Sequence, residues 1–369
     1  MAKKRINILG VTGSIGASTA KVVLSAPDQF EVNVISGHSR REDLQSLKEQ
    51  LGAKHAVCTA EDTLEDFLDE PVDLTVSAIT GFAGLRPLLK AIENSKAVAI
   101  ANKEPLVAAG PLVIAACEKY DTQILPIDSE HNAIFQVFDH DNKDSIERII
   151  LTASGGPFRT WSVLDMKQAT PEQAVDHPNW SMGQKISVDS ASMMNKALEV
   201  IEAHYLFNMS AEQIDVLVHP QSVVHSMVEY SDGSILSQMG ASDMCTPIAY
   251  ALAWPQRMRT PGERLNLAEM RDLSFEELDT EKFPAIGFAK DAIRSGLGAC
   301  IALNAANEIA VDAFLGERIG FGDINTCVAK GLDIHSQYAK SIANDAGLED
   351  IEALDLDIRS QITTFMKKL

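Results

Sequence analysis

The first 124 residues alternate between short apolar runs and helical patterns, and this alternation constrains the fold more than any other feature of the chain. Apolar runs of strand length occur at 5–9, 31–36, 73–79 and 97–101, and segments with helical spacing follow them at 15–26, 41–51, 85–94 and 106–120. Strands that alternate with helices form a parallel sheet that is covered by helices on both faces. The sequence therefore predicts an α/β fold that begins with such a sheet.

A glycine-rich turn lies between the first predicted strand and the first predicted helix. Gly10, Gly13 and Gly16 alternate there with the hydroxyl residues Thr12 and Ser14. Glycines at this spacing permit a tight turn, a close approach of the backbone to a pyrophosphate, and close packing of the helix. We interpret the turn as the dinucleotide-binding loop of a Rossmann-type sheet, and a turn that binds no ligand is the alternative.

The residues after the second predicted strand favour NADPH over NADH. Arg40 and Arg41 follow the apolar run 31–36, and the nearest acids are Glu42 and Asp43. NAD enzymes usually have an acid at the end of the second strand, whereas an arginine there accommodates the 2′-phosphate of NADP. The alternative is that both arginines only open a solvated helix.

Two carboxylates follow directly on the apolar run 123–126. Asp128 and Glu130 lie two positions apart, so a continuing strand would place both on one face. Two hard oxygen ligands so close together favour Mg²⁺ or Mn²⁺ over zinc. The alternative is a helix start, with Asp128 or Ser129 as the N-cap and acids in the first turn.

A strand is predicted at 185–188 and a helix, capped by a serine or an aspartate, at 189–204. One face of this helix carries mixed donors, a cation and an acid, at Ser192, Asn195, Lys196 and Glu199. An ordinary amphipathic helix accounts for such a stripe, but apolar residues of the same segment already supply a face for the core.

The loop at 176–184 contains Pro178, Trp180 and Gly183 and has neither helical nor alternating periodicity. A tryptophan in such a loop is typical of an active-site lid. A tryptophan packed permanently in its own domain is the alternative.

The remaining segments complete a four-part organisation. A strand at 148–153 leads into the glycine turn 154–158, and antiparallel strands are predicted at 215–218, 223–230 and 234–239. His219 and His225 read as packed histidines of these strands, without a catalytic role. The predicted parts are an NADPH-binding domain at 1–124, a central α/β catalytic metal and substrate domain at 125–253, a linker at 254–283 and a C-terminal α-helical domain at 284–369.

Composition excludes several classes of protein. The formal net charge of −20 argues against a nucleic-acid surface, which needs a basic stripe, but permits a local site for an anionic small molecule. The odd number of widely spaced cysteines, Cys58, Cys117, Cys245, Cys300 and Cys327, indicates buried thiols without a disulfide framework or a zinc knuckle. No apolar run reaches the length of a membrane span, and the N-terminal one ends at Gly10. We therefore expect no membrane association and a reducing, cytoplasmic compartment.

These motifs resemble those of the 1-deoxy-D-xylulose 5-phosphate reductoisomerase family. The matching stretches cover nearly the whole chain in order, at 10–16, 101–104, 126–136, 154–158, 177–183, 185–190, 193–196, 219–222 and 303–308. The resemblance implies a metal-dependent retro-aldol/aldol rearrangement and NADPH reduction of 1-deoxy-D-xylulose 5-phosphate to 2-C-methyl-D-erythritol 4-phosphate, in the non-mevalonate pathway to isoprenoid precursors. It also implies a homodimer with Mg²⁺ or Mn²⁺ that acts on a small phosphorylated sugar, with no nucleic-acid or membrane partner.

The resemblance further implies roles for individual residues. The implied metal ligands are Asp128, Glu130 and Glu199, which are also the implied catalytic residues together with Lys103 and His177. The implied substrate-binding residues are Ser129, Glu130, Ser154, His177, Trp180, Ser190, Asn195 and Lys196. The implied cofactor-binding residues are Thr12, Gly13, Ser14, Ile15, Gly37, His38, Ser39, Asn102, Glu104 and Gly183. The chain departs from the family pattern at His38 and Ser39, where a basic residue and asparagine are common, and at Pro105, where serine is common.

Two other functions remain open on the sequence alone. A different NADP-linked dehydrogenase with the same first domain would act without a divalent metal. A regulator that senses NADPH and binds a partner protein would have no need of Glu199 in a polar stripe.

Overall fold

The computed structural model describes residues 2–180, 182–270, 272–337 and 342–369. Its internal contacts separate two compact units, each discontinuous in sequence. The first comprises Met1–Pro105, Val113–Gln136 and Gly240–Leu265, and the second comprises Leu106–Leu112, Val137–Met239 and Asn266–Leu369. The functional division predicted at 124, 253 and 283 stays a prediction.

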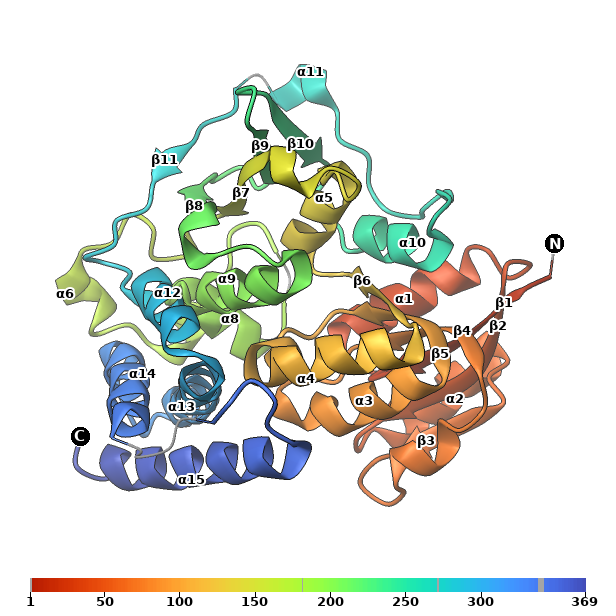
Figure 1. The fold of residues 1–369 in the computed structure, drawn as a ribbon, viewed down its shortest axis with the longest axis horizontal. Coiled ribbons are helices and arrows are strands. Elements are labelled where there is room, and N and C mark those ends of the chain that lie inside the picture. The colour runs from red at the N-terminus through yellow and green to blue at the C-terminus, as the bar shows by residue number, and fades with distance from the viewer. Residues whose placement is uncertain (1, 181, 271, 338–341) are drawn as a thin grey trace. The chain divides into compact units, whose positions relative to one another are not determined.

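The first unit contains a six-stranded sheet in the order β3-β2-β1-β4-β5-β6 (Figure 1). Its strands are β1 (Lys4–Leu9), β2 (Phe30–Gly37), β3 (His55–Cys58), β4 (Val72–Ser77), β5 (Ser95–Ile100) and β6 (Gln123–Pro126). All neighbouring strands are parallel. The strand order reverses between β1 and β4, where sheets of this topology bind dinucleotides beyond the carboxyl ends of the strands. The predicted Rossmann-type sheet is confirmed.

Helices cover this sheet on both faces. Those that contact its strands are α1 (Ser14–Leu24), α2 (Arg41–Leu51), α3 (Leu85–Glu93) and α10 (Cys245–Ala253). Helix α4 (Glu104–Tyr120) follows β5, α5 (Ser129–Val137) follows β6, and η1 (Leu64–Phe67) and η2 (Phe82–Gly84) are short 3₁₀ turns. Although α10 is distant in sequence, it packs against α1, and apolar residues of both helices join strand residues in one core. The strands are almost continuously apolar because both of their faces are buried.

The second unit contains a mixed sheet in the order β10-β9-β7-β8-β11. Its strands are β7 (Ile146–Ala153), β8 (Ile214–Val218), β9 (Val224–Tyr230), β10 (Ile235–Met239) and β11 (Glu276–Glu277). The predicted β9–β10 hairpin is confirmed. Strand β8 is not a neighbour of β9, and it pairs in parallel with β7 and antiparallel with β11. The long helical connection between β7 and β8 permits their parallel pairing, since parallel neighbours need a crossover.

The helical C-terminal region is confirmed. It contains α12 (Ala285–Ser295), α13 (Leu297–Leu315), α14 (Phe321–Ser336) and α15 (Leu348–Met366), and α13 contacts both α14 and α15 (Figure 1). Among the helices that the structure describes, α13 alone is long and apolar enough to cross a membrane, but 83% of that apolar window is buried inside the protein. Such burial is typical of the core helix of a globular domain.

The remaining helices of the second unit are short or lie near its sheet. They are α6 (Val163–Met166), α7 (Pro171–Val175), α8 (Gln184–Ala191), α9 (Met194–Phe207), α11 (Leu267–Met270), η3 (Lys143–Ser145) and η4 (Ala211–Gln213). Both α11 and β11 fall within the predicted linker 254–283, which is therefore not devoid of secondary structure.

Two predictions for the region 185–204 are wrong. Residues 185–188 form the first half of α8 rather than a strand, and Lys185 Nζ lies 2.8 Å from Asp189 Oδ2, the i,i+4 pairing of a helix. The helix predicted at 189–204 is interrupted because Met193 adopts a left-handed conformation with φ of 62°. Since α9 begins only at Met194, Ser192 does not share its face with the rest of the polar stripe.

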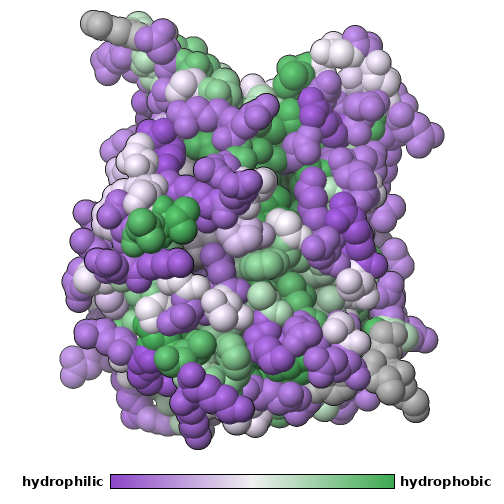
Figure 2. Space-filling view, turned by 90° about the vertical axis from the view of Figure 1, so that its left-hand side faces the viewer, coloured by the Kyte–Doolittle hydropathy of each residue, from purple (hydrophilic) through white to green (hydrophobic). Residues whose placement is uncertain are grey.

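The face in Figure 2 is mostly hydrophilic, with hydrophobic residues in several patches, the most extended of them in the upper and central part of the view. The five cysteines are buried and unbridged, as predicted. Burial raises the pKa of the Cys117 thiol and that of the Cys300 thiol to about 12, so these groups stay protonated and unreactive at neutral pH.

Candidate active site

The glycine-rich turn between β1 and α1 leaves no room for side chains at two positions. Gly10 has φ of 82°, and a Cβ there would lie 2.5 Å from the carbonyl oxygen of Ala78. A Cβ on Gly16 would lie 2.2 Å from the carbonyl oxygen of Gly10. Gly13 is the N-cap of α1, and no described side chain caps this helix. The first N–H groups of α1 therefore remain for an anionic ligand such as a pyrophosphate.

The residues after β2 lie beside this turn. A Cβ on Gly37 would lie 3.0 Å from Thr12 Cγ2, and Arg40 Nη2 donates a hydrogen bond to the carbonyl oxygen of Thr12. His38 Nδ1 lies 3.1 Å from Thr59 Oγ1, so its ring is fixed to the residue after β3. The predicted cofactor residues of the first two βα turns thus form one group.

The two arginines after β2 have different partners, so we expect them to contribute unequally to NADPH binding. Arg40 contacts the glycine-rich turn, whereas Arg41 pairs with Glu61. Replacing both by alanine is expected to raise the Kd for NADPH about 10- to 150-fold, because a charge-assisted contact with the 2′-phosphate is worth about 1.5–3 kcal/mol. We expect Arg40→Ala alone to give most of this loss and Arg41→Ala to give little. Calorimetric titration with NADPH and NADH checks this, and equal losses for both cofactors would contradict the assignment.

Asp128 caps α5 instead of continuing β6, so the helix start, which was the alternative, is confirmed. The carbonyl oxygen of Asp128 accepts the N–H of Asn132 at 2.8 Å, and Asp128 Oδ1 accepts the N–H of Glu130 at 3.3 Å. Glu130 therefore stands in the first turn of α5, where the helix dipole favours a carboxylate.

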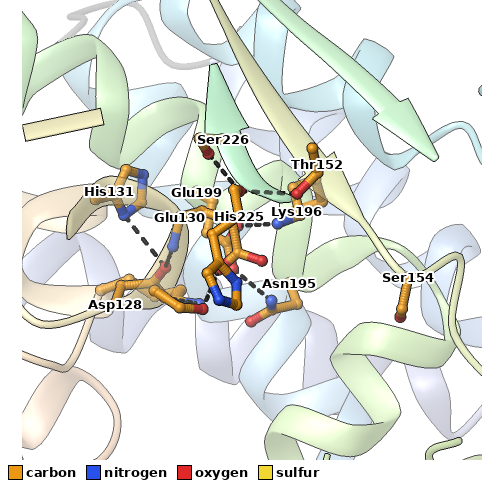
Figure 3. A network of polar contacts seen from close by, with 12 residues as sticks. Asp128, Glu130, His131, Thr152, Ser154, Asn195, Lys196, Glu199, His225 and Ser226 are labelled. Atoms are coloured by element: carbon orange, nitrogen blue, oxygen red, sulfur yellow. Dashed lines mark hydrogen bonds and ion pairs between the residues drawn. The ribbon is translucent and has the colours of Figure 1, made fainter. Parts of the chain in front are cut away.

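Asp128 and Glu130 form a compact acidic pair. An oxygen of each lies within 4.8 Å of the other. Lys103 Nζ lies 2.9 Å from Asp128 Oδ2 with both side chains largely buried, and His131 Nδ1 lies 3.6 Å from Asp128 Oδ1 (Figure 3). Ser129 Oγ donates to Glu130 Oε2 at 2.6 Å. Hard oxygen donors at this spacing suit Mg²⁺ or Mn²⁺, and a divalent cation would offset the charge that Lys103 leaves uncompensated.

Asn102 and Glu104 flank Lys103 at the start of α4. Asn102 Nδ2 donates to the carbonyl oxygen of Gly81 at 3.0 Å, which joins the loop after β5 to the loop after β4. Glu104 is the first residue of α4 and is 4% exposed. Both predicted cofactor residues thus lie at the carboxyl edge of the parallel sheet.

In the second unit, two side chains of α9 converge on Glu199 (Figure 3). Asn195 Nδ2 donates to Glu199 Oε1 at 2.5 Å, and Lys196 Nζ donates to Glu199 Oε2. The Glu199 side chain is only 1% exposed. A carboxylate buried to this degree needs a cation and hydrogen-bond donors, since an unpaired buried charge costs several kcal/mol.

His177 is held in one tautomer. Its Nδ1 accepts the N–H groups of Asn179 at 3.1 Å and of Trp180 at 3.0 Å, so its proton is on Nε2, which lies 2.9 Å from Ser154 Oγ. Burial lowers the pKa of His177 to about 4, so the ring is neutral at pH 7. Ser154 Oγ accepts this proton and the N–H of Gly156 at 3.1 Å, which leaves its own hydroxyl proton to donate to a ligand.

The turn after β7 packs against the last turn of α8. Gly155 and Gly156 have φ of 84° and 65°, and a Cβ on Gly156 would lie 2.6 Å from the carbonyl oxygen of Ser190. This contact brings Ser154 and Ser190, two of the predicted phosphate ligands, to one region of the second unit.

The loop at 176–184 is fixed mainly by side chains. Asn179 Nδ2 donates to the carbonyl oxygen of Pro220 at 2.6 Å and to Ser222 Oγ at 2.9 Å. Asn179 was not among the predicted site residues, although an amide between Pro178 and Trp180 in a non-periodic loop was a signal for it. Trp180 is half-buried, with its ring centroid 6.2 Å from that of His225, and Ser181 lies outside the described residues.

Trp180 is only half-buried, so a substitution can distinguish a lid residue from a residue that is packed permanently in its domain. We expect Trp180→Ala to lower turnover roughly tenfold or more, because the closed loop excludes water, while the melting temperature stays close to that of the parent. Trp161→Ala removes a ring 4.5 Å from Phe158 and is the comparison, with an expected loss of stability. Turnover and thermal unfolding are measured on both variants. A Trp180→Ala protein that melts far below the parent would instead indicate a packing residue.

Within its units, the structure groups the predicted residues into four sets. Those of the first unit lie around the glycine-rich turn (Thr12, Gly13, Ser14, Ile15, Gly37, His38, Ser39) and at the ends of β5 and β6 (Asn102, Lys103, Glu104, Asp128, Ser129, Glu130). Those of the second lie along the loop, the turn after β7 and α8 (Ser154, His177, Trp180, Gly183, Ser190) and on α9 (Asn195, Lys196, Glu199). The roles of all these residues stay predictions.

The sequence is similar to one enzyme family along most of its length. The profile of 1-deoxy-D-xylulose 5-phosphate reductoisomerase matches residues 6–71 and 35–110, that of its C-terminal domain matches 124–207, and a further DXP reductoisomerase C-terminal domain matches 239–361. The reductoisomerase of Zymomonas mobilis is 47% identical, over 99% of this chain and 98% of its own. That of Chlorobaculum tepidum is 48% identical, over 91% and 94%.

Solved structures of such enzymes share the fold. The Zymomonas mobilis enzyme in complex with NADPH has a TM-score of 0.92 and 45% identity, with full coverage of both chains. A DOX-P reductoisomerase in complex with NADPH, fosmidomycin and magnesium has a TM-score of 0.91 and 42% identity, over 99% of this chain and 98% of that one.

Proposed function

Since the chain belongs to the 1-deoxy-D-xylulose 5-phosphate reductoisomerase family, we propose that it rearranges and reduces 1-deoxy-D-xylulose 5-phosphate to 2-C-methyl-D-erythritol 4-phosphate, using NADPH and a divalent cation. The observation that carries this proposal is a pair of largely buried carboxylates that each face a lysine, Asp128 in the motif 126–136 and Glu199 three residues after the motif 193–196.

We propose Asp128, Glu130 and Glu199 as the ligands of one Mg²⁺ or Mn²⁺. All three supply carboxylate oxygen, the donor type that both ions prefer. When bound, the cation polarises the ketone and hydroxyl oxygens of the substrate, and NADPH supplies the hydride. Lys103 and Lys196 each hold one carboxylate in a fixed rotamer, which supports their proposed roles beside the substrate.

The substrate phosphate is assigned to Ser154, Ser190, Asn195 and Lys196. The hydroxyl of Ser154 acts as a donor because its oxygen already accepts two hydrogen bonds. His177 orients this hydroxyl by donating its Nε2 proton to Ser154 Oγ. Because the imidazole is neutral at pH 7, it contributes a hydrogen bond rather than a charge. The Asn179–Trp180 segment, tied to the same imidazole, excludes water from the aldehyde that is reduced.

NADPH is assigned to the glycine-rich turn and the residues around it. The N-terminus of α1 binds the pyrophosphate, and Arg40 binds the 2′-phosphate. Both lie at the carboxyl ends of the strands, where the strand order reverses between β1 and β4. Ser39, Asn102, Glu104 and Gly183 complete the proposed cofactor residues.

The activity is tested by following NADPH oxidation in the presence of 1-deoxy-D-xylulose 5-phosphate, with added Mg²⁺ or Mn²⁺ and after chelation. We expect oxidation to require both the sugar phosphate and the metal, with a product identified by mass spectrometry and NMR as 2-C-methyl-D-erythritol 4-phosphate. Oxidation of NADPH that continues unchanged after chelation would favour a metal-independent dehydrogenase.

We also propose that the enzyme is a homodimer, as the family resemblance implies, and that it works in the cytoplasm, as its cysteines indicate. The buried thiols fit a reducing compartment, because none is bridged in the described structure. Light scattering of the purified protein tests the dimer, and a monomer mass at assay concentration would contradict it.

A further inference from the structure

The family motif at 303–308, on α13, is left without a role by the proposed function. Asn304 and Asn307 lie three residues apart on this helix, and both are 0% exposed. The next residue, Glu308, is bonded by Arg359 Nη2 of α15 at 2.5 Å, so one end of the motif holds the helices together. Two buried amides in an otherwise apolar helix cost free energy unless they are bonded, and their partners therefore indicate what they do.

Asn307 reaches a carboxylate of α8. Its Nδ2 donates to Asp189 Oδ1 at 2.8 Å, and Lys185 Nζ lies 2.8 Å from Asp189 Oδ2. The Asp189 side chain is 1% exposed. Each oxygen of this buried carboxylate thus has its own donor, and removing a donor leaves part of a buried charge unsatisfied.

Asp189 directly precedes the proposed phosphate ligand Ser190. Its carbonyl oxygen accepts a hydrogen bond from Ser192 Oγ at 3.2 Å, so both its main chain and its side chain are held. The carbonyl of Ser190 in turn faces the left-handed Gly156, two residues after Ser154. A shift of Asp189 therefore moves Ser190 against the turn that carries the other phosphate serine.

We propose that Asn307 is a positioning residue for the substrate phosphate. By holding Asp189, it fixes the last turn of α8 and keeps Ser190 in register with Ser154, and it keeps Lys185 paired on the same helix. Helix α13 of the C-terminal region thus contributes to substrate affinity as well as to packing. This inference rests on the proposed function and deepens its phosphate site.

Asn304 supplies a matched control. It lies on the same helix, is equally buried, and its Oδ1 and Nδ2 make no hydrogen bond within the described structure. Asn304→Leu and Asn307→Leu therefore make the same change of shape and polarity one helical turn apart, and they differ in the bond to Asp189.

The test compares four quantities in both variants: the KM for 1-deoxy-D-xylulose 5-phosphate, the inhibition constant of inorganic phosphate against that substrate, the Kd of NADPH, and the melting temperature. Asn307→Leu is expected to raise the first two together by about tenfold, since a hydrogen bond to a charged group is lost. The Kd of NADPH should stay within about twofold of the parent value, because the lost bond is not part of the proposed cofactor site. Asn304→Leu should leave the KM and the phosphate inhibition constant unchanged.

A second variant protects the test against a failure of Asn307→Leu to fold. Asp189→Asn keeps the shape of the side chain, and it should raise the KM and the phosphate inhibition constant in the same way. If Asn307 acts through Asp189, the double variant loses little more than either single variant. Additive losses, or an Asn307→Leu protein with the parent KM, would overturn the inference. A parent protein without turnover would instead contradict the proposed function.

Discussion

Replacing Glu199 by glutamine will lower turnover about a thousandfold or more while the Kd for NADPH stays within about twofold of the parent value, since polarisation by a bound cation is worth several kcal/mol of barrier. The side chain is 1% exposed and is bonded by Lys196 and Asn195, so glutamine of the same shape fits the space. The substitution would, however, place a neutral amide against the ammonium group of Lys196, which faces a carboxylate in the parent. Steady-state kinetics at saturating Mg²⁺, with calorimetric titration of NADPH, measure both effects.

Glu202 is the comparison for this variant. It lies on the same helix, three residues further on, and is 0% exposed, but it is not in the proposed ligand set. Glu202→Gln is expected to affect mainly the melting temperature. A Glu199→Gln enzyme with near-normal rate at ordinary Mg²⁺ would show that the assignment of Glu199 is wrong.

Gly16→Ala is expected to raise the Kd for NADPH at least tenfold and to destabilise the protein by about 1–3 kcal/mol, the usual cost of overpacking. The added Cβ would meet two backbone groups, the carbonyl oxygen of Gly10 at 2.2 Å and Val11 Cα at 2.4 Å. Neither can move without displacing the turn that is assigned to the pyrophosphate. Isothermal titration and thermal unfolding measure the two losses.

Gly287→Ala is the matched control, because Gly287 also lies within a helix, α12, and a Cβ there meets nothing within 4 Å. Alanine should stabilise α12 by up to about 1 kcal/mol, the difference in helix propensity. If Gly16→Ala binds NADPH as tightly as this control, the turn does not hold the cofactor as proposed.

The parallel sheet was predictable because its signals are local and redundant. Each of the strands β1, β2, β4 and β5 is an apolar run followed by a segment with helical spacing. The structure has a strand at each of these runs and a helix at each of these segments. Strand β3 (His55–Cys58) escaped prediction, since its four residues begin with a histidine and are too few to show an alternating pattern.

The region around α8 was not predictable from local pattern. Residues 185–188 carry the β-branched Ile186 and Val188, which favour a strand, but the structure makes them helical. The segment also makes contacts that no local pattern contains, among them the bond from Asn307 to Asp189. The left-handed Met193 that separates α8 from α9 was likewise unexpected, because non-glycine residues rarely adopt this conformation.

The sequence indicated candidate site residues, whose roles stay predictions, but it did not indicate their geometry. Residue type and spacing alone indicated hard oxygen ligands at Asp128 and Glu130, whereas the helix start that orients them was one of two alternatives. The tautomer of His177 depends on two backbone N–H groups of a loop without periodicity. Sequence patterns do not determine such bonds, which require the folded positions of the groups.

If Asp128, Glu130 and Glu199 hold a single divalent cation, titration with Mn²⁺ followed by electron paramagnetic resonance detects that site without turnover. The parent, Asp128→Asn and Glu199→Gln are compared in the presence of NADPH. We expect one Mn²⁺ per parent chain and an affinity lowered by about a hundredfold or more in each variant, since even outer partners of metal ligands are worth about 10–100-fold. Parent-like Mn²⁺ affinity in either variant would show that the replaced carboxylate is not a ligand.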